Sequence, residues 1–239
     1  MTARRVSTAA LVGAGVAHAA PALTALGPVR RRLLPTLCGV GAPGHVALTF
    51  DDGPDPRSTP AFLAALERHG VTATFFLLGR MLTDAPGLAR EMVAAGHEIG
   101  LHGWSHRCLL ARGPRATRDD LTRGYDLIGE VLGAPPRWYR PPYGVLTGSA
   151  LWAANRLGMR TVLWTTWGAD WRSGATPGSV LRTVRRDLAG GGTVLLHDSD
   201  CTSAPGSWRA TLGALPALLD HARAGDLDVG PLREHRIAG

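Results

Sequence analysis

The chain of 239 residues is 45% hydrophobic and 19% charged, a composition that indicates a folded globular protein and excludes a mainly disordered one. Its length suits one large α/β domain, and its net charge of +7 comes from arginine alone, because the sequence has no lysine. The arginines are scattered and lack interleaved aromatic residues, so we expect no nucleic-acid partner. Cys38, Cys108 and Cys201 form no CxxC pair, which indicates neither a zinc knuckle nor a disulfide scaffold.

The first 44 residues differ in composition from the rest of the chain. Arg4 and Arg5 precede a run of small apolar residues, and the letters AHA at positions 17–19 resemble the cleavage site of a secretory signal. Alanine and glycine are weakly apolar, so a membrane-spanning helix is not expected, and a packed or amphipathic helix is the alternative. We therefore expect residues 1–44 to be a leader or pre-domain segment that associates the protein with the membrane or the cell wall, in an extracytoplasmic location.

From residue 45 onward, short apolar runs alternate with helical patterns. Strands are predicted at 45–50, 72–78, 97–103, 160–165 and 193–197, and helices at 58–70, 84–96, 117–133, 149–158, 179–191 and 208–224. We expect Ser58 to cap the first of these helices and Pro216 to kink the last one or delay its start. Apolar strands that alternate with helices predict parallel pairing, in a closed barrel or in an open doubly wound sheet.

Polar side chains fall at or just past the carboxyl ends of several predicted strands. They are Asp51, Asp52, His102, Arg140, Asp170 and His197. A barrel gathers its active site at this edge from many strands, whereas an open sheet concentrates it at one crevice. Contributions from five separate strands therefore favour a barrel.

Two short motifs carry residues that suit a metal ion. The stretch TFDDGPD contains Asp51 and Asp52; by itself it is also typical of a polar turn, and it lacks the oxygen ligands of a calcium loop. His102 and His106 of HGWSH can converge on one ion if the segment turns, and Gly103 favours such a turn. Two imidazoles and one carboxylate leave a coordination position open, as in catalytic zinc sites. One aspartate would then be a ligand and the other a general base.

These motifs, followed by RPPYG, DW and LLH in this order, resemble the five motifs of the polysaccharide deacetylase family, also called the NodB-homology or carbohydrate esterase 4 group. The resemblance extends from residue 45 to about residue 200. It implies a distorted (β/α) TIM-like barrel as the catalytic domain, which we place at residues 45–239. It also implies metal-dependent removal of N-acetyl groups from an amino-sugar glycan, peptidoglycan-like or chitin-like. The implied ion is divalent, usually Zn²⁺ and in some members Co²⁺ or Ni²⁺.

The resemblance implies a role for each matching residue of the first three motifs. Asp51 corresponds to the general base, and Asp52, His102 and His106 correspond to the metal ligands. Arg140 corresponds to the arginine that orients the base, because a guanidinium beside a carboxylate favours its ionised form.

The remaining motifs imply the leaving-group chemistry and the substrate pocket. His197 corresponds to the general acid that protonates the departing amine, and Asp170 to its carboxylate partner. Tyr143 corresponds to the position whose backbone N–H holds the developing oxyanion. Trp171 and Leu195 correspond to apolar residues that line the acetyl pocket, although core packing alone also accounts for such side chains.

Two positions depart from the family pattern. Trp167 stands where many members have the first aspartate of DxxDW, which leaves the shape of the substrate groove open. Gly103 replaces the usual serine or threonine of the metal motif, and we expect this to alter loop rigidity without loss of the metal. Two alternatives to glycan deacetylation are hydrolysis of another small amide or imide, and glycan binding without catalysis; the complete set of reacting side chains disfavours the second.

Overall fold

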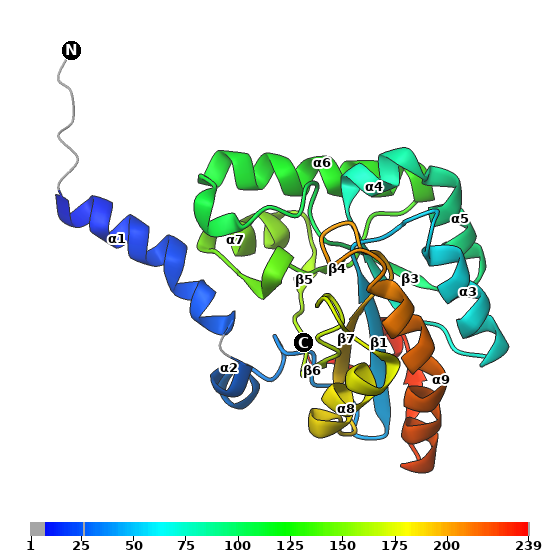
Figure 1. Ribbon diagram of the computed structural model, residues 1–239. Coiled ribbons are helices and arrows are strands. Elements are labelled where there is room, and N and C mark those ends of the chain that lie inside the picture. The colour runs from blue at the N-terminus through cyan, green and yellow to red at the C-terminus, as the bar shows by residue number, and fades with distance from the viewer. Residues whose placement is uncertain (1–7, 26, 239) are drawn as a thin grey trace.

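The computed structural model describes residues 8–25 and 27–238, and its centre is a curved sheet of parallel strands (Figure 1). The strands are β1 (His45–Asp51), β2 (Thr74–Leu77), β3 (Glu98–Leu101), β4 (Trp138–Tyr139), β5 (Arg160–Thr161), β6 (Thr166–Trp167), β7 (Thr193–His197) and β8 (Asp228–Gly230). Their order is β5-β4-β3-β2-β1-β7-β6, and β8 pairs with β1. Since β5 and β6 are the two edges, the sheet is a distorted, open (β/α) barrel, which confirms the expected fold class.

Helices surround this sheet, and α1 extends away from the rest of the molecule (Figure 1). The α-helices are α1 (Thr8–Ala19), α2 (Gly27–Leu33), α3 (Thr59–Arg68), α4 (Gly79–Asp84), α5 (Pro86–Ala94), α6 (Pro114–Leu132), α7 (Gly148–Arg156), α8 (Pro177–Asp187) and α9 (Trp208–Ala224). The short 3-10 helices are η1 (Ala20–Ala25), η2 (Leu109–Ala111), η3 (Pro142–Gly144) and η4 (Leu232–Glu234). Within the described ranges, no helix has the length and apolar character needed to cross a bilayer.

Strand β1 places a carboxylate inside the barrel because successive side chains point to opposite faces of a strand. Leu48 and Phe50 pack into the main core on the helix side, where the Phe50 and Phe75 rings stack at 5.0 Å between centroids. Ala47 belongs to a separate buried cluster, on the opposite face. Asp51 continues the face of Ala47 and so reaches the barrel interior at the carboxyl end of the strand.

Most predicted elements are confirmed, with shifted ends. The strand predicted at 193–197 and the helix predicted at 208–224 agree with β7 and α9 in both bounds. The helix predicted at 117–133 begins earlier, at Pro114, because proline is favoured in the first turn of a helix. The strand predicted at 160–165 is interrupted, because Leu163 leaves the sheet and its backbone N–H bonds to the carbonyl of Leu37.

Two predictions about single residues need correction. Ser58 occupies the N-cap position of α3, but its side chain makes no capping hydrogen bond. A late start of the last helix at Pro216 is wrong, because α9 begins at Trp208 with the proline inside it. Burial of the apolar side chains Leu215 and Leu218 accounts for a helix that tolerates this proline.

The second half of the predicted pre-domain segment lies across the opening between β5 and β6. In addition to the bond between Leu163 and Leu37, the Thr193 hydroxyl donates to the carbonyl of Gly39 at 2.7 Å. The side chain of Cys38, which lies between Leu37 and Gly39 in the sequence, is fully buried. These contacts attach residues 37–39 to the folded body, while a division of the chain at residue 44 stays a prediction.

Candidate active site

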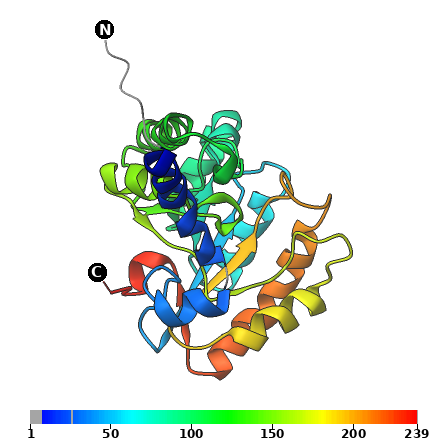
Figure 2. The same ribbon diagram turned by 90° about the vertical axis from the view of Figure 1, so that its left-hand side faces the viewer.

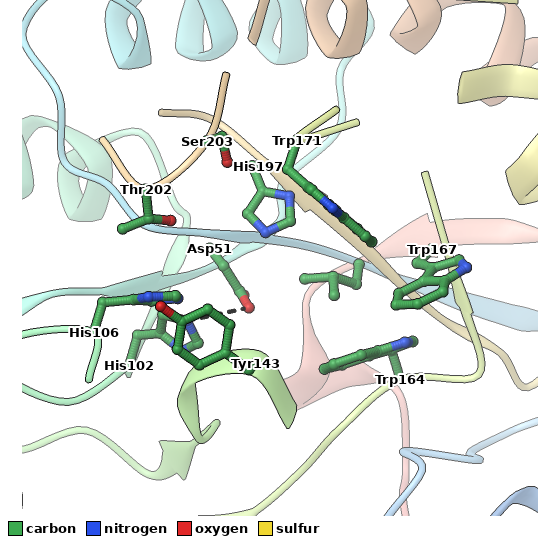
Figure 3. A pocket seen from close by; sticks show the side chains of 11 residues that line it. Asp51, His102, His106, Tyr143, Trp164, Trp167, Trp171, His197, Thr202 and Ser203 are labelled. Carbon is green, nitrogen blue, oxygen red and sulfur yellow. Dashed lines mark ion pairs between the residues drawn. The ribbon is translucent and has the colours of Figure 1, made fainter. Parts of the chain in front are cut away.

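A cavity of about 230 Å³ lies where the sequence predicted an active site, at the carboxyl ends of the strands. Figure 3 shows the rings of His102 and His106 on one side of it and three indoles on the other. The lining residues are Asp51, His102, His106, Tyr143, Trp164, Trp167, Trp171, Leu195, His197, Thr202 and Ser203. The other predicted site residues, Asp52, Arg140 and Asp170, are buried and contact this lining.

The predicted metal ligands converge on one point. One ligand atom from each of Asp52, His102 and His106 lies within 4.8 Å of the other two. Oδ1 of Asp52 is 3.6 Å from Nε2 of His102 and 3.5 Å from Nε2 of His106. These separations leave room for an ion between the three atoms, since zinc binds nitrogen and oxygen ligands at about 2.0–2.2 Å.

The chemistry of the three donors fits a metal ion. Oδ1 of Asp52 is buried and has no hydrogen-bond partner among the described residues, and a bare buried carboxylate oxygen is costly. The Nδ1–H of His102 donates to the carbonyl of Arg140 at 2.8 Å, which leaves the Nε2 lone pair free for the ion. Burial and the neighbouring His106 lower the pKa of His102 to about 3, so this imidazole is neutral at pH 7.

The loops that carry the triad have unusual backbone angles. Asp52 has a φ of 84° and His106 a φ of 45°, in the left-handed region that few side chains adopt. Gly103 has a φ of 90°, and a Cβ atom there would lie 3.0 Å from the Asp120 carboxylate. That carboxylate accepts from the backbone N–H of Trp104 at 2.7 Å, so an acid from α6 holds the turn. Glycine thus fits this tight turn.

Asp51 and Arg140 form a buried pair beside the triad. Nη1 of Arg140 donates to Oδ1 of Asp51 at 2.8 Å and to the Thr49 hydroxyl at 2.7 Å, and Nη2 donates to the carbonyl of Leu163 at 2.8 Å. Burial raises the pKa of Asp51, and Arg140 opposes this effect. Oδ2 of Asp51, the oxygen turned from the arginine, is 3.7 Å from Nε2 of His102. It is therefore available to a substrate or a water molecule in the cavity.

His197 and Asp170 form a second pair across the cavity. Nδ1–H of His197 donates to Oδ1 of Asp170 at 2.9 Å, and Thr211 donates to Oδ2 at 2.7 Å. Burial by itself lowers the pKa of His197, but the carboxylates of Asp170, Asp52 and Asp51 outweigh it and raise this pKa to about 10. A cation held by Asp52 would cancel part of that effect. The two pairs place one carboxylate, held by an arginine, and one imidazole, held by a carboxylate, at the same cavity.

The remaining predicted residues form the walls. Tyr143 has a φ of 59°, and its ring packs edge-on against His106 at 4.5 Å between centroids. The Trp171 ring lies 5.7 Å from the His197 ring, and Leu195 lines the same cavity. Trp167 packs against Trp171 at 4.9 Å, so the residue that departs from the family pattern extends the apolar wall.

A sequence model described as polysaccharide deacetylase matches residues 39–162, more than half of the chain. The chain belongs to the polysaccharide deacetylase family. A chitooligosaccharide deacetylase of Bradyrhizobium sp. is 37% identical over 186 residues, which cover 72% of this chain and 84% of that protein. The peptidoglycan-N-acetylglucosamine deacetylase PgdA of Listeria monocytogenes is 33% identical over 160 residues, which cover 67% of this chain. They cover 34% of PgdA, so this chain matches about a third of that longer relative.

A solved structure supports the same family and fold. It is a peptidoglycan N-acetylglucosamine deacetylase in complex with a naphthalenyl N-hydroxybenzamide compound, and it matches with a TM-score of 0.76 at 28% sequence identity. The match covers 83% of this chain and 92% of that structure. The distorted barrel is therefore the fold of polysaccharide deacetylases.

The sequence did not reveal three residues that shape this deacetylase-family site. The hydroxyl of Thr202 donates to Oδ2 of Asp52, the oxygen that does not face the histidines. Trp164 lines the cavity and stacks on Trp167 at 6.0 Å between centroids. Asp120, which lies on α6 and follows His106 by 14 residues, accepts a hydrogen bond from the turn of the metal motif. None of the three lies in a quoted motif, so their roles become visible only in the folded chain.

Proposed function

We propose that this chain is a metal-dependent hydrolase that removes N-acetyl groups from an amino-sugar glycan of the peptidoglycan or chitin type. The observation that carries the proposal is the arrangement of Asp51 and His197. One is a buried carboxylate fixed by an arginine and the other an imidazole fixed by a carboxylate, and both line the cavity of the metal triad. Hydrolysis of an amide needs such a base and such an acid on one substrate.

Asp52, His102 and His106 would hold the metal ion, for which we propose Zn²⁺, with Co²⁺ or Ni²⁺ as the alternatives. When bound, such an ion would act as a Lewis acid that polarises the acetyl carbonyl and lowers the pKa of a water molecule beside it to about 7. The hydroxyl of Thr202 orients Asp52, and the carbonyl of Arg140 orients His102, each through a hydrogen bond to the atom that does not face the ion.

Asp51 would take the proton from the attacking water at Oδ2. Its Oδ1 is held by Arg140, so the carboxylate has a fixed direction and one free oxygen. Arg140 donates four hydrogen bonds to described residues and is fully buried, which prevents it from turning toward the substrate. Arg140 therefore acts as a positioning residue and Asp51 as the catalytic base.

His197 would deliver a proton from Nε2 to the amine as the carbon–nitrogen bond breaks and acetate leaves. Its Nδ1–H is engaged by Asp170, which fixes the ring and favours the charged form before transfer. The backbone N–H of Tyr143 would stabilise the oxyanion, and Trp171 with Leu195 would enclose the acetyl methyl group. These assignments use every predicted site residue.

We propose an N-acetylated glycan outside the cytoplasm as the substrate. The relatives named for peptidoglycan and chitooligosaccharide deacetylation support a polymer of N-acetylated amino sugars. An acetate-release assay tests this directly, using purified protein with added zinc or cobalt on chitin oligomers and peptidoglycan fragments. Hydrolysis of small cyclic imides, which yields no acetate, is measured in parallel as loss of the imide. Acetate from either glycan supports the proposal, whereas turnover of the imides alone would favour the alternative amide hydrolase.

A further inference from the structure

A second cavity, of about 530 Å³, lies between the N-terminal helices and the barrel. Its lining is almost entirely apolar: Leu23, Leu33 and Leu37 come from the N-terminal segment, and Leu146 and Leu151 from the region of α7. Figure 2 views the face on which this segment, drawn in blue, meets the barrel. We call this cavity the leucine groove; it shares no lining residue with the active-site cavity.

One charged side chain, Arg30, lines the leucine groove, and it is 3% exposed. Its Nη1 donates to the carbonyl of Thr24 at 3.1 Å and its Nη2 to the carbonyl of Trp164 at 2.9 Å. Its Nε is buried and has no hydrogen-bond partner in residues 8–25 and 27–238. The guanidinium also lies over the Trp164 ring, 4.9 Å from its centroid. Arg30 is therefore fixed in place, while its Nε–H is left without a partner among the described residues.

The charge of Arg30 lacks compensation within the described part of the chain, where no carboxylate lies within 4.0 Å of it. The nearby guanidinium of Arg140 is paired with Asp51. The thiol of Cys38 is beside Arg30, but burial raises the pKa of that thiol and keeps it neutral. A buried guanidinium without an anion is unfavourable, which points to an anionic group supplied from outside the chain.

Arg30 also lines a smaller cavity of about 260 Å³, with Arg31 and Arg186. Asp187 is the carboxylate in its lining, and its Oδ2 is 3.5 Å from Arg31 and 3.4 Å from Arg186. Three guanidinium groups and one carboxylate leave this second space positively charged. We call it the arginine cavity. An apolar space and a basic space thus adjoin at one residue.

The surface around the leucine groove is apolar as well. Leu23 and Leu33, which line the groove, are 66% and 68% exposed. Val12 and Val16, earlier in the chain on α1, are each 60% exposed. Exposed apolar side chains beside arginines are typical of segments that lie on a membrane surface. These exposed apolar side chains favour a membrane lipid over a free small anion as the ligand of the site.

We propose that the leucine groove and the arginine cavity together bind one anionic phospholipid, with an acyl chain in the groove and the phosphate headgroup against Arg30 and Arg31. The two parts of such a lipid suit the two parts of the site. The apolar acyl chain suits the leucine groove, and the negatively charged phosphate suits the positively charged arginine cavity. Such a lipid would supply the anion that Arg30 lacks. It would also hold the protein at a membrane surface.

The proposal can be tested with short-chain lipids that remain monomeric in solution. Native mass spectrometry would measure binding of dioctanoyl phosphatidylglycerol, which is anionic, against dioctanoyl phosphatidylcholine, which has no net charge. We expect a one-to-one complex with phosphatidylglycerol that is at least about tenfold tighter than with phosphatidylcholine, because the choline cation of the second lipid offsets its phosphate charge and is repelled by the arginines.

Matched variants locate the site. Arg30→Gln should weaken phosphatidylglycerol binding about tenfold, whereas Arg32→Gln, an exposed neighbour that lines neither cavity, should not change it. Because the buried Arg30 contributes to folding, Leu33→Asp at the exposed rim provides an independent variant, and Leu110→Asp on a different surface is its control. Equal affinity for the two lipids, equal effects of the paired variants, or binding to vesicles without binding to monomeric lipid would each overturn the proposal.

Discussion

Arg140 and Asp51 are 2.8 Å apart, and both side chains are almost completely shielded from solvent. One comes from the loop after β4 and the other from the end of β1, so the folded barrel creates the pair. A buried ion pair depends on both partners, since removal of either leaves a charge in a medium of low polarity.

Arg140→Met should therefore destabilise the protein strongly. We expect the free energy of unfolding at pH 7 to fall by about 3–5 kcal/mol, because the Asp51 carboxylate loses its partner. The double variant Asp51→Asn with Arg140→Met should recover part of this loss, since the remaining side chain is neutral. Urea denaturation of the wild type, both single variants and the double variant would measure the coupling; strictly additive losses would show that the pair does not interact.

The metal triad predicts losses of metal at defined positions. Asp52→Ala and His102→Ala each remove one of three converging ligands, so zinc content after dialysis should fall well below one ion per chain. His221→Ala, on α9, is a matched control that should retain the ion. Elemental analysis decides the assignment, and stoichiometric zinc in the triad variants would refute it.

Thr202 should tune the metal site without being a ligand. Its hydroxyl donates to Oδ2 of Asp52, and the loss of such a supporting bond weakens metal binding by about 10–100-fold in other sites. We expect Thr202→Val to weaken zinc binding about tenfold and Thr202→Ser to restore it. Competition with a chelator would measure the affinities. Wild-type affinity in the valine variant would mean that the hydroxyl does not support the ligand.

His197 should make the stability of the metal-free protein depend on pH. Its pKa is raised to about 10 in the folded chain from about 6.5 when unfolded. A raised pKa gives stability that is fully present below about pH 6.5 and is lost as the pH rises toward 10. The free-energy difference between the wild type and His197→Gln should therefore shrink across this window. His221→Gln is the control, and a constant difference between pH 6.5 and 10 would contradict the raised pKa.

The sequence predicted the parts of the site that lie at the ends of strands. Alternating apolar runs located β1 and β7, and the polar residues that follow them are the ones that meet in the cavity. Adjacent Asp51 and Asp52 point to different partners, one to Arg140 and one to the histidines, as the turn after β1 requires. The positions of the predicted strands and the quoted motifs therefore indicated which residues lie together at the cavity, while their roles stay a proposal.

Other features depend on contacts between distant segments. Thr202 and Asp52 are 150 residues apart in sequence, and a threonine in a polar loop has no pattern that marks it. The strand β8 has three residues and owes its conformation to pairing with β1, so periodicity could not find it. The attachment of Cys38 and its neighbours to the barrel is likewise a tertiary effect, because their composition resembles that of the apolar leader before them.

The most direct test of the account compares acetate release by the wild type and by Asp51→Asn, each loaded with zinc and supplied with N-acetylated chitin oligomers or peptidoglycan fragments. We expect acetate from the wild type, a decrease of at least about 100-fold in the variant, and equal zinc content in both proteins. Equal acetate release by the two zinc-loaded proteins, or none from the wild type with either glycan, would contradict it.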